Sequence, residues 1–268
     1  AGEVKTLLYF SPSIMEKIVQ DLHESNLITD EIIKAISSDD KKSAEKELKK
    51  ASDAAKKILK GLGSEVSDAA DIALFGRMVA DDASLTIEGA SMFSHALSTH
   101  AVRSDLDFFS AVDDEKKDAE DAGAGHIGTV EFNSACYYRY IGINLDLLKQ
   151  SNMFDQTQYK EVLKNFIEAT VMANPVARKN SMFAYSLPAF ILGIRRQGQP
   201  LSLANAFEEP VKQSKHGYVA QSIEKLIEEW NYLKKTFALT SEAEIMVGKE
   251  QATLPELIDK MTAESNEP

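Results

Sequence analysis

Residues 128–140 read GTVEFNSACYYRY and carry the clearest strand pattern in this chain. Successive side chains of a β-strand point to opposite faces, so the alternation along this stretch predicts one strand with two different sides. One side holds Val130, Phe132, Ser134, Cys136, Tyr138 and Tyr140, and the other holds Glu131, Asn133, Ala135, Tyr137 and Arg139. The first side can cover a core. The amide, phenol and guanidinium groups of the second side either contact a nucleotide or form the ordinary wet face of a half-buried strand.

A second strand precedes this one. Residues 105–112, DLDFFSAV, alternate in the same way and predict a strand. The intervening residues 113–125 are strongly acidic and end in glycines. Two strands joined by a long polar loop predict a protruding hairpin.

The remaining segments predict a mixture of helices and strands. Ser11 and Pro12 are typical of a helix start, because proline at the first helical position loses no hydrogen bond. The other expected helices cover residues 39–61, 66–80, 87–97, 157–173, 218–237 and 254–261. The other expected strands cover residues 181–185 and 189–195, with Pro188 between them. Strands separated by helices, with one hairpin, indicate an α+β fold.

Length and composition restrict the class of protein. The 268 residues, 44% of them hydrophobic, are enough for one large or two modest domains. The single cysteine, Cys136, has no intrachain partner, which excludes a disulfide framework and favours a reducing compartment. No stretch approaches the roughly 20 apolar residues that span a bilayer, and the amino terminus lacks a signal-peptide pattern. We therefore expect a soluble, cytoplasmic protein that does not contact a membrane.

The charge is negative overall but unevenly distributed. The net charge of −12 argues against nucleic acid as a partner. Between residues 176 and 217, however, there is a local excess of +4, which leaves −16 for the rest of the chain. The charged residues of this stretch are Arg178, Lys179, Arg195, Arg196, Lys212 and Lys215 against Glu208 and Glu209. A locally positive strip can bind a polyanion, because exposed charges act over about 10 Å. The same cations can equally serve only to solubilise loops.

Five segments in chain order closely resemble one known family. They are residues 73–81 (ALFGRMVAD), 95–102 (HALSTHAV), 107–114 (DFFSAVDD), 123–140 (GAGHIGTVEFNSACYYRY) and 199–211 (QPLSLANAFEEPV). Together they resemble the backbone subunit of the type I-E CRISPR Cascade complex, the CT-type or CasC family. The resemblance runs from about residue 7 to the end of the chain.

The resemblance implies a particular form of the α+β fold. It implies an RRM-like (ferredoxin-like) palm with a helical finger region and a long β-hairpin thumb. The finger region would cover residues 1–101, the thumb residues 102–132 and the palm residues 133–268. Family members open with a core strand and a stretch rich in arginine and serine that contacts RNA. Since nothing similar precedes Ala1, we expect this chain to lack that segment and its palm to miss the first strand.

The resemblance also implies a function. Such a subunit is a non-catalytic scaffold of an antiviral ribonucleoprotein complex that binds CRISPR RNA. Copies of it polymerise along the guide RNA and present its bases for pairing with target DNA. The implied partners are therefore CRISPR RNA, other copies of the chain, the other Cascade subunits and, through the guide, target DNA. No cofactor and no metal ion are expected.

The matching positions suggest which residues contact RNA. Phe109, Ser110 and Val112 match the base-contacting side of the thumb, and Met78 matches a finger residue that wedges against a kink in the RNA. The remaining matches are the palm-loop residues Lys179, Asn180, Ser181, Lys212 and Lys215, with Arg178 added because it stands beside Lys179.

Each assignment has a simpler alternative. A methionine on an apolar helix, such as Met78, is more often a core residue. Phe108 and Phe109 point to opposite strand faces, so we expect at most one to touch RNA while the other packs inward. Glu208 and Glu209 lie close enough in sequence to Lys212 to neutralise it as a phosphate ligand.

Two other classes of function remain open. A metal-dependent ribonuclease could draw on His95, His100, His126, Asp107, Asp113 and Asp114. His95 and His100 are five residues apart, however, and would not share a helix face as a metal-binding pair does. The other class is a protein-interaction module without RNA contacts, because copies that meet head to tail form an open filament through protein contacts alone.

Overall fold

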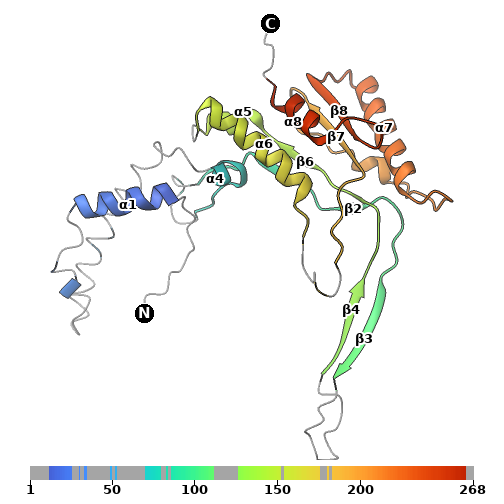
Figure 1. The fold of residues 1–268 in the computed structure, drawn as a ribbon, viewed down its shortest axis with the longest axis horizontal. Coiled ribbons are helices and arrows are strands. Elements are labelled where there is room, and N and C mark those ends of the chain that lie inside the picture. The colour runs from blue at the N-terminus through green and yellow to red at the C-terminus, as the bar shows by residue number, and fades with distance from the viewer. Residues whose placement is uncertain are drawn as a thin grey trace, which may run out of the picture. The chain divides into compact units, whose positions relative to one another are not determined.

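The computed structural model describes residues 12–25, 30, 33–34, 49, 52, 70–79, 83, 86–111, 126–151, 154–175, 180 and 183–263 (Figure 1). Its contacts divide the chain into two compact units. The first unit consists of Ala1–Met92, Gly142–Leu187 and Leu254–Pro268. The second consists of Phe93–Ile141 and Pro188–Thr253.

The first unit is helical. It contains α1 (Pro12–Glu24), α4 (Ala70–Phe75), α5 (Leu145–Gln150), α6 (Gln156–Met172) and α8 (Leu254–Thr262). Helices α6 and α8 pack against each other. The buried apolar side chains of these five helices are Ile14, Ile72, Ala73, Leu74, Leu148, Leu163, Phe166, Leu257 and Ile258. Burial of these faces supplies most of the helical stability, because isolated helices of such lengths are marginal in water.

Helix α6 begins at a complete capping box. The side chain of Asp155 accepts hydrogen bonds from the backbone N–H groups of Thr157 (2.8 Å) and Gln158 (2.9 Å). The side-chain oxygen of Gln158 accepts a bond from the backbone N–H of Asp155 in return (2.9 Å). Both exchanges satisfy N–H groups that have no partner inside the helix, and so they fix where the helix starts.

The second unit combines short strands with one long helix. Strands β7 (Phe190–Arg195) and β8 (Ala243–Gly248) pair antiparallel, from Phe190↔Gly248 to Arg195↔Ala243. Between them lie η3 (Ala204–Phe207) and α7 (Val219–Thr236), which contact each other. Trp230 of α7 is 1% exposed and is the largest buried side chain among the described residues.

The described strands form two-stranded pairings. Strand β1 (Ser91–Phe93) pairs with β6 (Ile141–Ile143), β2 (Leu97–Ser98) with β5 (Tyr137–Tyr138), and β3 (Asp105–Ala111) with β4 (His126–Phe132). Figure 1 shows β3 and β4 side by side as a hairpin arm of the second unit. An α+β fold is therefore confirmed.

Several elements follow the sequence-based expectations. The structure confirms the helix start at Pro12, the helices at residues 157–173, 218–237 and 254–261, and the strand at 189–195, each to within one or two residues. The hairpin strand expected at residues 105–112 is confirmed as β3. The expected helix at 39–61 and the acidic loop at 113–125 lie almost entirely outside the described residues.

The prediction of one continuous strand over residues 128–140 is wrong. Strand β4 ends at Phe132, and β5 begins only at Tyr137. In the interruption the backbone N–H of Cys136 donates to Nε2 of His100 (3.1 Å), and the carbonyl of Cys136 accepts from the N–H of Thr99 (2.9 Å). The side chain of His100 therefore accepts a hydrogen bond from an N–H group that, in a continuous strand, would donate to the neighbouring strand. The alternation of residue types along the sequence cannot reveal this.

The predicted helix at 87–97 is also wrong, because this segment contains β1 and the start of β2. Arg77 and Ile87 exchange two backbone hydrogen bonds of 2.8 Å, and Ala90 donates to Ala73 (2.9 Å). The close approach requires glycine, since a Cβ on Gly89 would lie 2.7 Å from the carbonyl carbon of Phe75. Contacts distant in sequence therefore override the helical pattern.

Two further predictions fail in part. The helix expected at 66–80 is shorter among the described residues, because α4 ends at Phe75 and Gly76 adopts φ +79°. Positive φ ends a right-handed helix, and glycine adopts it without strain. The strand expected at 181–185 is absent from its described part, since residues 183–187 pair with no strand.

Candidate nucleic-acid interface

The β3–β4 hairpin carries Phe109 and Phe132 on one face and Phe108 on the other. Phe109 pairs with Gly128, and Phe108 pairs with Thr129. A Cβ built on Gly128 would lie 2.5 Å from Cζ of Phe109, so the ring occupies the space that a side chain at position 128 would fill. The hairpin therefore holds the Phe109 ring against its own backbone, as an aromatic residue opposite a strand glycine commonly does.

Neither Phe108 nor Phe109 is buried. Phe109 is 45% exposed, Phe108 is 71% exposed, and their neighbour Leu106 is 55% exposed. The expectation that one of the two rings packs inward is wrong. Ser110 pairs with Ile127 within β3 and β4, and Val112 lies outside the described residues. The hairpin thus presents bare apolar surface on both faces.

Met78 stands on the turn that follows α4. Its side chain is 83% exposed, which contradicts the alternative that it is a core methionine. The turn is well anchored, because Val79 is buried and its N–H donates to Oγ1 of Thr86 (3.2 Å). Phe75, three residues earlier, is 62% exposed. An apolar side chain held on a fixed turn is suited to wedging between bases.

The basic residues at 178–181 are only partly described. Arg178, Lys179 and Ser181 lie outside the described residues. Asn180 is an exposed turn residue. Their assignment to RNA therefore stays a prediction.

Lys212 and Lys215 belong to a loop that also contains acid. Nζ of Lys212 lies 3.7 Å from Oε1 of Glu209, as the sequence predicts. Nζ of Lys225 lies 4.0 Å from the other carboxylate oxygen and donates to the backbone carbonyl of Glu209 (2.8 Å). The Lys212 side chain is 85% exposed, so the pair is weak and a phosphate can displace the carboxylate.

Buried hydrogen bonds fix the start of this loop. The N–H of Val211 donates to the carbonyl of Thr99 (2.9 Å), and Val211 is 4% exposed. The hydroxyls of Thr99 and Ser222 lie 2.8 Å apart and are both buried. The N-terminal part of α7 and the residues around Thr99 therefore set the position of the lysines.

The side chain of His100 also belongs to this support. Its ring stacks on Tyr218 with centroids 3.7 Å apart and planes 11° apart. Nδ1 lies 2.9 Å from the carbonyl of Ala101, and Nε2 accepts the N–H of Cys136 (3.1 Å). Both ring nitrogens are thus engaged with backbone. Among the described residues no group of three or more His, Cys, Asp and Glu side chains could hold a metal ion.

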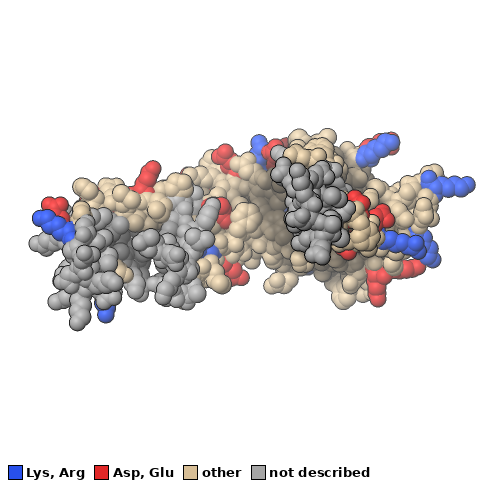
Figure 2. Space-filling view, turned by 90° about the horizontal axis from the view of Figure 1, so that it is seen from below, with Lys and Arg blue, Asp and Glu red and all other residues tan. Residues whose placement is uncertain are grey.

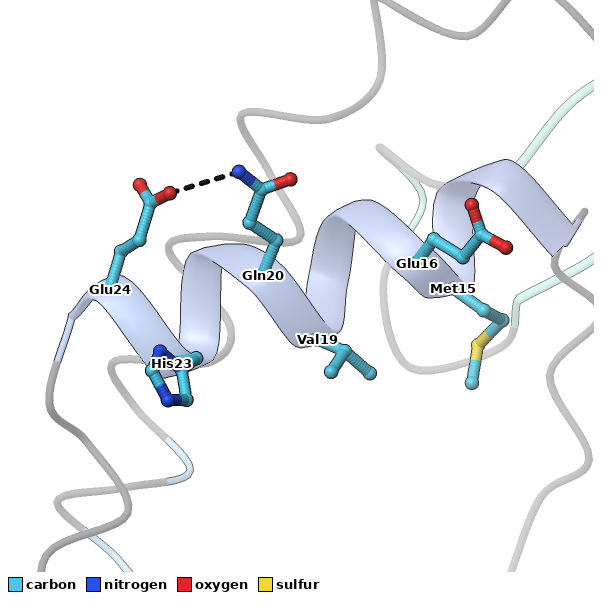
Figure 3. A pocket seen from close by; sticks show the side chains of 6 residues that line it. All are labelled: Met15, Glu16, Val19, Gln20, His23 and Glu24. Carbon is cyan, nitrogen blue, oxygen red and sulfur yellow. Dashed lines mark hydrogen bonds between the residues drawn. The ribbon is translucent and has the colours of Figure 1, made fainter.

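Two surface features bear on the electrostatics of the interface. On the face drawn in Figure 2, the described cations and acids are scattered, and no continuous basic strip is visible among them. A shallow hollow at α1 is lined by Met15, Glu16, Val19, Gln20, His23 and Glu24. Figure 3 shows that all six come from one helix, with Gln20 bonded to Glu24 (3.0 Å). This hollow gathers no polar groups from a second element and indicates no ligand.

Two exposed aromatic residues were not identified as candidate site residues from the sequence. Phe183 and Tyr185 are 75% and 44% exposed, and their ring centroids lie 6.5 Å apart. They were not considered as site residues because residues 181–185 were predicted to form a strand. The sequence signal that could have drawn attention to them is the absence of acid around them, since residues 169–207 contain no aspartate or glutamate.

The chains of solved structures that resemble this one include two from CRISPR RNA-guided complexes. One belongs to a "CRISPR RNA-guided surveillance complex, pre-nicking", with a TM-score of 0.63 and 29% identity over 78% of this chain and 57% of that chain. The other belongs to a "CRISPR RNA-guided surveillance complex", with a TM-score of 0.61 and 29% identity over 72% of this chain and 77% of that chain. This chain thus spans little more than half the length of the first.

Sequence comparisons complete the assignment. No curated protein matches the chain. Within the described residues no helix is long and apolar enough to cross a membrane. The model of the family described as "CT1975-like protein" matches residues 1–267, nearly the whole sequence. The chain belongs to the CT1975-like family of CRISPR-associated (Cas) proteins.

Proposed function

We propose that this chain is a CRISPR RNA-binding scaffold subunit of a Cascade surveillance complex of type I-E. The observation that carries the proposal is the family match over residues 1–267, joined by similarity to chains of CRISPR RNA-guided surveillance complexes. In this proposal, copies of the chain line up in the cytoplasm along the guide RNA beside the other Cascade subunits. Base pairing between the guide and target DNA then reads the sequence, while the protein holds the backbone.

The proposed fold assigns a task to each region. Residues 1–101 are the helical finger region, residues 102–132 the thumb, and residues 133–268 the RRM-like palm. The β3–β4 hairpin fits a thumb because its exposed apolar faces can replace the stacking that a flipped base loses. Met78 fits the finger wedge because its side chain is exposed on an anchored turn.

The cations would hold phosphates. Lys179 and Arg178, with Asn180 and Ser181 beside them, form the group least affected by neighbouring acids, because no acid lies within nine residues on either side. Lys215 and Lys212 form a second group, in which Glu209 competes for Lys212. Phosphate contacts of this kind give affinity without sequence preference.

We further propose that the subunit is not an enzyme. This is supported by His100, one of the three histidines of the ribonuclease alternative, because both of its ring nitrogens contact backbone groups. Labelled RNA incubated with Mg²⁺ or Mn²⁺ and the protein is expected to stay intact. Cleavage that disappears in Asp113→Ala would replace the scaffold with a ribonuclease.

Fluorescence anisotropy with a labelled single-stranded RNA tests the binding itself. We expect binding that weakens steeply between about 50 and 200 mM salt, because each phosphate contact releases counterions. Lys179→Ala should weaken binding to all sequences alike and reduce the salt slope by about one. Lys235→Ala, which removes an exposed cation of α7 outside the assigned set, is the matched control.

A salt-independent affinity, or an equal loss in Lys179→Ala and Lys235→Ala, would contradict the phosphate clamp. Self-association without any RNA binding would identify the chain as an interaction module alone.

A further inference from the structure

An exposed aromatic pair, Phe183 and Tyr185, lies in the first unit. The two rings have centroids 6.5 Å apart and planes 33° apart. Phe183 is 75% exposed and Tyr185 44% exposed, and Leu187 two residues further on is 55% exposed. Three large apolar side chains at alternate positions thus have little of the chain packed against them. Large side chains left bare in a row mark a contact surface more often than a monomer surface.

The backbone beneath the aromatic pair is anchored. Nδ2 of Asn174 donates to the carbonyl of Ser186 (2.6 Å), which ties the segment to the chain just beyond the end of α6. Pro188 follows directly and fixes its own φ. The segment that carries the rings is therefore tied at its C-terminal end, which reduces the entropy that it loses on binding a ligand.

The surrounding sequence favours a polyanion over an acidic or neutral partner. Residues 169–187, all in the first unit, contain Arg178 and Lys179 and no acid, in a chain with 42 acidic residues. Lys179 stands four positions before Phe183 in the sequence, so the chain length alone keeps their Cα atoms within roughly 14 Å of each other. A cation and two aromatic faces within this reach are the elements with which proteins bind single-stranded nucleic acid.

We propose that Phe183 and Tyr185 form a stacking platform for bases of single-stranded RNA. This assignment rests on the proposed function and adds to it a base-contacting surface that belongs to neither the hairpin nor the Met78 turn. Stacking on aromatic rings is tolerant of sequence because every base has a π-face. A platform of this kind would hold the guide without selecting its letters.

The first experiment measures binding of Phe183→Ala/Tyr185→Ala to labelled oligouridine and to an abasic oligonucleotide of equal length. We expect roughly 5- to 100-fold weaker binding to oligouridine, and the same affinity as wild type for the abasic strand. The slope of affinity against salt should stay unchanged, because no phosphate contact is lost. Tyr232→Ala/Phe237→Ala removes two rings of 57% and 62% exposure elsewhere and should bind oligouridine as wild type does.

Two further variants separate stacking from a folding defect. Phe183→Tyr/Tyr185→Phe keeps both rings and should retain wild-type affinity. Phe183→Trp adds a reporter to a chain whose one natural tryptophan, Trp230, is 1% exposed. Tryptophan fluorescence of this variant should fall when oligouridine binds and stay constant with the abasic strand.

The outcomes distinguish the two levels of the proposal. If wild type binds RNA and Phe183→Ala/Tyr185→Ala binds it with the same affinity, the platform is overturned and the scaffold function stays in place. Absence of wild-type binding overturns both. Equal losses on oligouridine and the abasic strand overturn stacking. Loss of self-association in light scattering, with RNA affinity unchanged, would instead make the aromatic pair an interface between copies.

Discussion

At the scale of single residues, Gly128 and Phe109 determine what one face of the hairpin displays. The ring lies where a side chain at position 128 would stand, with Cζ 2.5 Å from the Cβ position. An aromatic ring held in this way keeps part of its area exposed and has fewer rotamers to lose on binding. Phe108 on the opposite face has no glycine across from it and is the barer of the two.

Gly128→Ala should displace the Phe109 ring. The added Cβ cannot coexist with the present ring position, but the ring is the end of a flexible side chain and can rotate. Alanine also suits a strand better than glycine does, so we expect the free energy of unfolding to change by less than about 1 kcal/mol. The measurement is the NMR chemical shift of the Phe109 ring protons.

Phe109→Ala supplies the comparison, because it should abolish the ring-current shift of the Gly128 α-protons. A Phe109 ring signal that is identical in wild type and Gly128→Ala would show that the ring does not lie over the glycine.

At the scale of elements, the capping box of α6 gives a direct test of local stability. Asp155→Ala removes the acceptor of two backbone N–H groups at the first turn. We expect the free energy of unfolding to fall by about 1 kcal/mol, the usual effect of losing an N-cap side chain. Asp155→Asn should restore most of the loss. Urea unfolding of the three proteins at one pH measures the difference.

Helix α7 and strand β8 are joined by Lys234 and Glu244, whose Nζ and Oε2 lie 3.1 Å apart. Burial alone would raise the pKa of Glu244, but the indole of Trp230 and the ammonium of Lys234 outweigh it and lower the pKa below its ordinary value near 4.5. Folding therefore favours the ionised carboxylate. This contribution to stability is complete above about pH 4.5 and is lost as the pH falls through the lower pKa of the folded protein.

Glu244→Gln should consequently lower the free energy of unfolding at pH 7 by up to about 1 kcal/mol. The difference in the free energy of unfolding between Glu244→Gln and wild type should become smaller as the pH is brought below 4.5. Urea unfolding at a series of pH values measures it, with the exposed Glu228→Gln as the control. A gap that widens on acidification would mean that folding disfavours the charged form.

The elements also show how far sequence patterns reach. Helices α6, α7 and α8 could be predicted because each repeats its apolar residues at helical spacing and buries them. The break between β4 and β5 could not, since it depends on the ring of His100, 36 residues from Cys136. Strand β1 was taken for helix because its partner β6 lies far along the chain.

In the candidate site, too, features that depend on neighbours in sequence could be predicted and features that depend on distant contacts could not. The pairing of Lys212 with Glu209 concerns neighbours in sequence, and local reasoning raised it. The exposed position of Met78 was suggested only by the family resemblance, because the local pattern favoured a core methionine. The glycine beneath Phe109 belongs to the other hairpin strand, and only the register reveals it. Phe183 and Tyr185 were missed because a strand pattern was assumed where the chain pairs with no strand.

At the scale of the whole molecule, the first unit depends on the last helix. Leu257 and Ile258 of α8 are 3% and 6% exposed, and α8 packs against α6. Leu257→Ala should lower the free energy of unfolding by about 2–5 kcal/mol, because it leaves a cavity. Hydrogen exchange should speed up in α6 more than in β7 and β8, which belong to the second unit.

Lys260→Ala, on the exposed side of α8, is the control and should leave exchange unchanged. Equal acceleration in α6 and β7 would show that the two units open together.

The division of the chain has a consequence for how the protein is made. The second unit ends at Thr253, and the first is completed only by Leu254–Pro268. The ribosome therefore releases every residue of the second unit before it releases α8. The first unit is therefore finished after the second, and the face of α6 that packs on α8 stays uncovered while residues 173–253 are made. A chaperone that shields apolar helices during translation would act on this face.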